Sequence, residues 1–198
     1  MCATQDGDVL IDLSPRRSWL AVTGPVALLI IIADRLTKWW IESRLEPGPC
    51  LRPDDCIDII GSLRIHFIEN PGMAFSQGEN VGQILAVVVI AMTALLIRLA
   101  MRTVSPARQA LLGLIIGGAI GNLIDRIIRA ENGFLSGSVV DFVDLQWFPI
   151  WNFADAGVTC GVIGLLLLGG RGEPALSSGD DATDGGTIDT NESDHEQA

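Results

Sequence analysis

Two acidic residues, Asp125 and Asp155, lie within long apolar runs of the sequence. A charged side chain at the centre of a membrane-spanning helix costs about 2.5–3.5 kcal/mol on insertion scales, so such residues usually serve a function. Two carboxyl groups that lie close together cannot both ionise cheaply, and one of them keeps a proton. Such a pair can activate water with one member while the other polarises a carbonyl group, which is the chemistry of an aspartic protease.

Other hydrolytic mechanisms lack the residues that they need. His66 and His195 are the only histidines, no HExxH motif is present, and the four cysteines form no CxxC pair. These absences argue against a zinc site, so we expect neither a metal nor a cofactor. No GxSxG motif with a partner histidine marks a serine hydrolase, and no GxGD element occurs. Cys50 and Cys56 share one loop, and the sequence is compatible either with a disulfide between them or with two free thiols.

Four apolar runs indicate membrane-spanning helices, over about 19–40, 81–101, 107–128 and 151–170. A bilayer core of about 30 Å requires about 20 helical residues, and backbone groups inside it must bond within the segment. The sequence therefore predicts an all-α membrane protein with four transmembrane helices in one domain, 19–170. Residues 1–18 would be a cytoplasmic N-terminal segment. The last residues, 171–198, include eight of the acidic residues and no Lys or Arg after Gly172, and we expect a disordered cytoplasmic tail.

Polar residues occur at matching ends of three predicted spans. They lie near the C-terminal ends of the first and third spans and near the N-terminal end of the fourth. Because neighbouring spans run in opposite directions, all of these groups should reach one depth, near the extracytoplasmic face. The three sets are Asp34 with Arg35 and Lys38, then Asn122 with Asp125 and Arg126, and finally Asn152 with Asp155.

Small residues precede Asp125 at helical spacing. Gly117, Gly121 and Asp125 are four residues apart, so they share one face of the third helix. Glycines on a helix face allow a neighbouring helix to approach closely, although plain packing would explain them equally well. This spacing predicts a second helix beside Asp125. The alternative for Asp125 is a salt bridge to Arg126 or Arg129.

The segments between the spans have different patterns. Residues 57–60 and 63–67 alternate in β-branched character around Gly61, which predicts a small strand pair within a β-like periplasmic segment at about 50–76. Residues 129–149 are mixed, and we expect an interfacial loop or helix there. Basic residues near Arg16 and between Arg98 and Arg108 place both termini in the cytoplasm by the positive-inside rule.

Five motifs occur together in an order that resembles the lipoprotein signal peptidases, or signal peptidase II. They are DRLTK (34–38), NPGMAFS (70–76), GGAIGNLIDR (117–126), VVDF (139–142) and WNFADA (151–156). The resemblance extends over about residues 19–170. Trp151 replaces the Phe that usually precedes the Asn of the last motif, and Met73 stands where Ala is common.

The resemblance implies an aspartic endopeptidase of the bacterial inner membrane. Its substrates would be diacylglyceryl-modified prolipoproteins, cleaved before the lipidated cysteine, with the active site near the periplasmic face and membrane lipids as neighbours. It also implies a surface β-cradle before Asn70 and a catalytic pair of Asp125 and Asp155. Supporting roles fall to Asn70, Gly72, Asn122, Arg126 and Asn152, and to Asp34, Lys38 and Asp141. We expect a monomer without a nucleic-acid partner.

A small ion-coupled transporter is the alternative, because intramembrane carboxylates also bind protons and cations. The polar residues gather toward one face, however, whereas transporter sites usually lie near the bilayer midplane between inverted repeats. No inverted repeat is apparent in the sequence.

Overall fold

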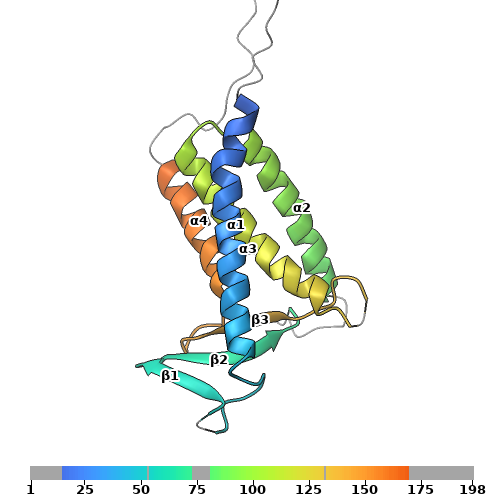
Figure 1. Ribbon diagram of the computed structural model, residues 1–198, viewed down its shortest axis with the longest axis vertical. Coiled ribbons are helices and arrows are strands. Elements are labelled where there is room, and N and C mark those ends of the chain that lie inside the picture. The colour runs from blue at the N-terminus through green and yellow to red at the C-terminus, as the bar shows by residue number, and fades with distance from the viewer. Residues whose placement is uncertain (1–14, 53, 73–80, 132, 170–198) are drawn as a thin grey trace, which may run out of the picture.

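The chain forms a helical bundle with a small sheet across one end (Figure 1). The computed structural model describes residues 15–52, 54–72, 81–131 and 133–169. The helices are α1 (Pro15–Glu42), α2 (Val81–Arg102), α3 (Pro106–Ile128) and α4 (Phe153–Gly169). The strands are β1 (Cys56–Ile60), β2 (Leu63–Asn70) and β3 (Val139–Asp144). The predictions for residues 1–14 and for the acidic tail lie outside the described residues.

Three of the helices are long and apolar enough to cross a membrane. They are the segment Trp19–Glu42 of α1, Gly82–Arg102 of α2, and α3. The fourth predicted span corresponds to α4, which is apolar but has 17 residues, or about 26 Å at 1.5 Å per residue. The predicted helical membrane bundle is therefore confirmed in its main lines, with three helices of full spanning length among the described residues.

Glycines on α3 allow its neighbours to approach closely. A methyl group at Gly117 would lie 2.7 Å from the carbonyl oxygen of Ala27 on α1, and one at Gly121 would lie 2.9 Å from Oδ2 of Asp34. At Gly118 a methyl group would overlap the carbonyl oxygen of Ala154 on α4. These small residues therefore seat α1 and α4 against α3, and the predicted close approach beside Asp125 is confirmed for α1.

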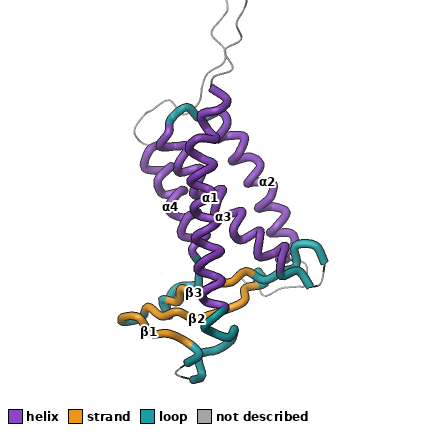
Figure 2. The backbone as a smooth tube through the Cα atoms, in the orientation of Figure 1, coloured by secondary structure: helices purple, strands orange, loops and turns teal. Residues whose placement is uncertain are grey.

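The sheet is antiparallel, in the order β1-β2-β3 (Figure 2). The predicted strand pair is confirmed as β1 and β2, which turn at Gly61 with a positive φ of 58°. The third strand lies within the segment that we expected to be an interfacial loop or helix, and the described residues there contain a strand and no helix. Its register pairs Asn70 with Val139 and Ile68 with Asp141. This pairing brings Asn70 and Asp141 to the same end of the sheet.

An apolar cluster attaches the sheet to the end of α1. It consists of Ile41 in the last turn of α1, Leu45 three residues after that helix ends, and Phe67, Val140 and Phe142 from the sheet. Burying these side chains fixes β2 and β3 beneath the bundle. On the outer side, a disulfide joins Cys50 to Cys56, which decides a pairing that the sequence left open.

Candidate active site

The predicted polar residues meet where the bundle ends on the sheet. Nine of the ten predicted site residues belong to one network of hydrogen bonds and ion pairs. The tenth, Arg126, donates instead to the Gly137 carbonyl oxygen at 3.2 Å. The network draws on α1, α3, α4, β2 and β3, so the predicted convergence at one depth is confirmed as contact.

Two asparagines lie at the centre of this network. Asn152 donates from Nδ2 to Oδ1 of Asn122 at 3.0 Å, and Asn122 donates from Nδ2 to Oδ1 of Asp155 at 2.8 Å. The same Nδ2 of Asn152 donates to Oδ1 of Asp141 at 2.6 Å. The amide pair therefore holds Asp141 and Asp155 on either side of itself.

The local sequence explains how Asp155 is oriented. Asn152 immediately precedes α4, and its Oδ1 accepts a hydrogen bond from the backbone N–H of Asp155 at 3.1 Å. In return, Oδ2 of Asp155 accepts from the backbone N–H of Asn152 at 3.2 Å. This reciprocal arrangement is a capping box, which satisfies backbone donors at the start of a helix. Asp155 also lies in the first turn, where the helix dipole favours negative charge.

Asp141 is the buried acid of the sheet, with 4% of its surface exposed. Its two oxygens accept from side-chain amides, Oδ1 from Asn152 and Oδ2 from Asn70 at 2.9 Å. Burial, reinforced by the nearby carboxylate of Asp155, raises the pKa of Asp141 to about 6. Asn70 is itself held by the backbone N–H of Gly72, which donates to its Oδ1 at 2.9 Å.

Asp125 has a different environment, in which cations neutralise it. Its Oδ2 lies 2.7 Å from Nζ of Lys38, and its Oδ1 forms an ion pair with Arg35. Oδ2 also accepts from the backbone N–H of Val140 at 3.3 Å. The ion pair that we considered for Asp125 therefore exists, but with residues of α1 instead of Arg126 or Arg129. Asp125 is linked to Asp155 through Lys38 and Asn122.

Asp34 and Lys38 complete the network on α1, and both are fully buried. Nζ of Lys38 lies 2.8 Å from Oδ2 of Asp34 and donates to Oδ1 of Asn122 at 3.1 Å. Oδ1 of Asp34 accepts from the backbone N–H of Ala154 at 3.1 Å, which ties the start of α4 to α1. Arg35 was not among the predicted site residues. Arg35 could have been found from its position three residues before Lys38, because residues three apart are neighbours on a helix surface.

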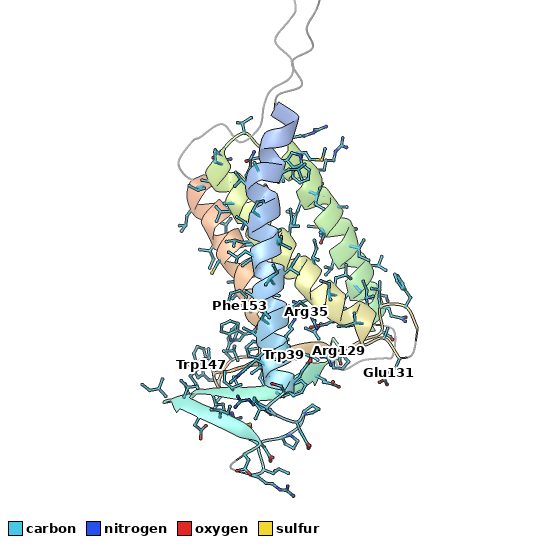
Figure 3. The ribbon with its side chains drawn as sticks, in the orientation of Figure 1. Arg35, Trp39, Arg129, Glu131, Trp147 and Phe153 are labelled. Carbon is cyan, nitrogen blue, oxygen red and sulfur yellow. A yellow bond between two sulfur atoms is a disulfide. The ribbon has the colours of Figure 1, made fainter. Side chains whose placement is uncertain are left out.

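An apolar cavity of about 600 Å³ opens beside Asp155. Its walls come from the chain between β3 and α4 and from the first turns of α4. Trp147 and Phe148 lie edge to face there, with ring centroids 5.9 Å apart, and Figure 3 shows Trp147 between the sheet and the bundle. Asp155 is therefore accessible from a cavity whose walls are otherwise mainly apolar.

The chain matches the family model described as signal peptidase (SPase) II over residues 26–169. The chain belongs to the signal peptidase II family. A relative from Rhodococcus jostii, named lipoprotein signal peptidase, is 40% identical over 143 residues, which cover 72% of this chain and 69% of that one. A relative of the same name from Bifidobacterium adolescentis is 36% identical over 172 residues, 87% of this chain and 88% of that one.

Solved structures resemble the fold of this signal peptidase II family member as well. One, titled a bacterial membrane enzyme structure by the in meso method at 1.9 Å resolution, superposes with a TM-score of 0.65 at 25% identity. The superposition covers 78% of this chain and 96% of the other. A second bacterial membrane enzyme, at 2.3 Å resolution, gives a TM-score of 0.63 at 26% identity. The fold is therefore that of a multi-pass membrane enzyme.

Proposed function

We propose that this protein is a membrane aspartic endopeptidase that removes signal peptides from diacylglyceryl-modified prolipoproteins by cleaving before the lipidated cysteine. Membership of the signal peptidase II family supports the peptidase activity and prolipoproteins as substrates. The aspartic mechanism is supported by the cluster of carboxyl and amide groups at the end of the bundle.

The contacts favour Asp141 over Asp125 as the partner of Asp155. The observation that carries this choice is Asn152, whose side chain binds Asp141 while its backbone N–H binds Asp155. Burial raises the pKa of Asp141 to about 6, so its protonated form is easier to populate near neutral pH than that of an ordinary carboxyl group. Asp125 instead forms ion pairs through both of its oxygens, with Lys38 and Arg35 of α1.

The chemistry divides between the two acids according to their exposure. Asp155 borders the open cavity, so its carboxylate takes a proton from a water molecule while the water oxygen attacks the scissile carbonyl carbon. Asp141 is the more buried acid, and its protonated form donates to the carbonyl oxygen as negative charge develops there. When the tetrahedral intermediate collapses, the C–N bond breaks and the leaving nitrogen takes up the proton held by Asp155.

Asp125 then acts by positioning. Its Oδ2 holds the backbone N–H of Val140, the residue before Asp141, and its ion pairs tie that strand to α1. Our sequence-based prediction that Asp125 is itself catalytic stays a prediction, and substitutions separate the two assignments.

The test uses purified protein, a diacylglyceryl-modified prolipoprotein and three matched variants, Asp125→Asn, Asp141→Asn and Asp155→Asn. We expect Asp141→Asn and Asp155→Asn to lower kcat at least about a thousandfold while the thermal midpoint stays near that of the wild type, because neither acid is in an ion pair with a described residue. Asp125→Asn should lower both the midpoint and kcat. Near-normal turnover by Asp141→Asn would return the catalytic role to Asp125.

If the wild type leaves the substrate uncut, the peptidase proposal fails. Proton or cation flux into vesicles containing the protein would then support the transporter alternative.

We further propose that the protein lies in the inner membrane of a bacterial cell. It would cross that membrane four times, with both termini in the cytoplasm. In Figure 1, α1 begins and α4 ends at the end of the bundle opposite the sheet. Arg98, Arg102 and Arg108 lie beside the connection between α2 and α3 at that end, as the positive-inside rule expects for the cytoplasmic side. The sheet and the site then face the periplasm. One chain supplies every group of the site, which fits a monomer.

A further inference from the structure

The apolar cavity beside Asp155 extends along α4. Ala156, Thr159 and Cys160 line it from α4, and their spacing places them on one face of the helix, progressively farther from the polar cluster. The opposite wall is formed by the chain that precedes α4, which contributes Leu145, Trp147, Phe148, Pro149, Ile150 and Trp151. The cavity therefore extends from the Asp155 carboxyl group at the end of the bundle along the first two turns of the apolar helix α4.

The aromatic wall is suited to the membrane interface. Trp147 is 74% exposed and Phe148 is 52% exposed, although both are large apolar side chains. Tryptophan in membrane proteins concentrates at the level of the lipid headgroups, where one end of the ring meets polar groups and the other meets hydrocarbon. Exposed aromatic side chains on the wall of the cavity therefore fit a position at the membrane interface, the depth where an acylated cysteine would lie.

We propose that this cavity receives an acyl chain of the diacylglyceryl group on the substrate cysteine, with the glyceryl end nearest Asp155. The proposal rests on the proposed function, because that function supplies a lipid attached next to the scissile bond. A chain seated along Ala156, Thr159 and Cys160 would leave the adjoining peptide bond beside Asp155. Trp151, which replaces a common Phe of the family motif, adds to the cavity wall.

The cavity would act by positioning more than by affinity. An acyl chain that enters it leaves hydrocarbon instead of water, so the transfer gains little of the usual hydrophobic free energy. What the cavity provides is a fixed place for the chain, which holds the scissile bond in a reactive geometry. The dependence of kcat/KM on acyl length is therefore the property to measure.

A second apolar cavity on the same helix provides a matched control. It measures about 520 Å³ and is lined by residues of α1, α3 and α4, among them Leu167. No titratable residue belongs to its described lining. Leu167 lies seven residues after Cys160, so both point to a similar side of α4, and both are exposed. Bulk lipid would occupy both cavities, whereas a substrate chain would use only the cavity at Asp155.

The first experiment compares Cys160→Trp with Leu167→Trp on two prolipoprotein peptides, one with dipalmitoylglyceryl cysteine and one with dibutyrylglyceryl cysteine. We expect Cys160→Trp to lower kcat/KM at least tenfold for the long-chain peptide and less than twofold for the short-chain peptide. Leu167→Trp should change neither by more than twofold. An equal loss on both peptides, or no loss on either, would overturn the proposal.

The second experiment measures binding without cleavage. In an Asp155→Asn protein with Cys2 replaced by Ser, Cys160 is the free cysteine of the described residues, and its alkylation by a maleimide can be timed. We expect the dipalmitoylglyceryl peptide to slow alkylation at least fivefold, whereas the unlipidated peptide has no effect. Equal protection by phospholipid would show that the cavity holds bulk lipid only. Protection of Cys160 in this variant, together with no cleavage of the same peptide by the wild type, would instead refute the proposed function and leave the acyl site standing.

Discussion

Replacing Lys38 by Met tests whether ion pairs stabilise the site. Lys38 is fully buried, and its Nζ lies 2.8 Å from Asp34 and 2.7 Å from Asp125. Methionine fills a similar volume but leaves both carboxylates without this cation. Removing one partner of a buried ion pair typically costs about 3–5 kcal/mol, because a charge is then left buried and uncompensated.

The remaining contacts of the two carboxylates narrow the expected loss of stability. Asp125 keeps its ion pair with Arg35, and Asp34 keeps the hydrogen bond from the backbone N–H of Ala154. We therefore expect a loss near the lower end of that range, about 3 kcal/mol. For a chain of this length, 1 kcal/mol corresponds to about 2–4 °C, so the thermal midpoint should fall by about 6–12 °C.

The assay is thermal unfolding in detergent, followed by tryptophan fluorescence, and SDS titration provides a second measurement. Adding Asp34→Asn to Lys38→Met removes the orphaned carboxylate and should restore about 2 kcal/mol of the loss. Arg44→Met is the control, since Arg44 is exposed and its contact with the Trp40 ring is worth about 1 kcal/mol or less. A loss from Lys38→Met no larger than that of the control, or no recovery in the double variant, would refute the reasoning.

Three further predictions concern other parts of the fold. Gly118→Ala should destabilise the protein by about 1–3 kcal/mol and lower kcat, because the new methyl group displaces α4. Gly24→Ala is the control and should do neither, because the space around Gly24 is open. Thermal midpoints and turnover of both variants check this prediction. Because burial raises the pKa of Asp141 to about 6, the folded protein binds a proton that the unfolded chain lacks between about pH 4 and pH 6, so stability should fall as pH rises through that window. Asp141→Asn should remove up to about 1 kcal/mol per pH unit of this slope in unfolding titrations, and an unchanged slope would count against the burial argument. Replacing Cys50 and Cys56 by Ala should cost about 2 kcal/mol in the same assay, and equal stability of both proteins would contradict a constraining role for the disulfide.

Much of the fold could be predicted because it depends on local pattern. The long helices follow from apolar length alone, and the strand pair follows from alternation around Gly61. The third strand could not be found in this way, because β3 pairs with a strand about seventy residues earlier in the chain. Its formation depends on a surface that exists only after the bundle and the β1–β2 hairpin have come together.

The sequence predicts that the polar residues of the site lie at one level of the bundle, but it does not predict which side chains bond to one another. Antiparallel helices bring Asp34, Asn122 and Asp155 to one level, and the network confirms it. The partner of each acid depends on side-chain direction, which sequence spacing does not determine. Arg35 illustrates this, since it is adjacent to Asp34 in the chain but forms its ion pair with Asp125 on α3.

The acid whose burial most needs an explanation differs between the sequence and the structure. From sequence, Asp125 stands out because it lies within an apolar span. In the structure, Lys38 and Arg35 form ion pairs with that carboxylate and compensate its buried charge. Asp141 lies in a strand that hydropathy does not single out, and amide groups of Asn70 and Asn152 supply its hydrogen bonds. No cation pairs with Asp141 among the described residues, and burial raises the pKa of Asp141 to about 6. The kind of group that compensates burial, neutral amides for Asp141 and cations for Asp125, is therefore the basis of our proposal that Asp141 is catalytic and Asp125 is structural.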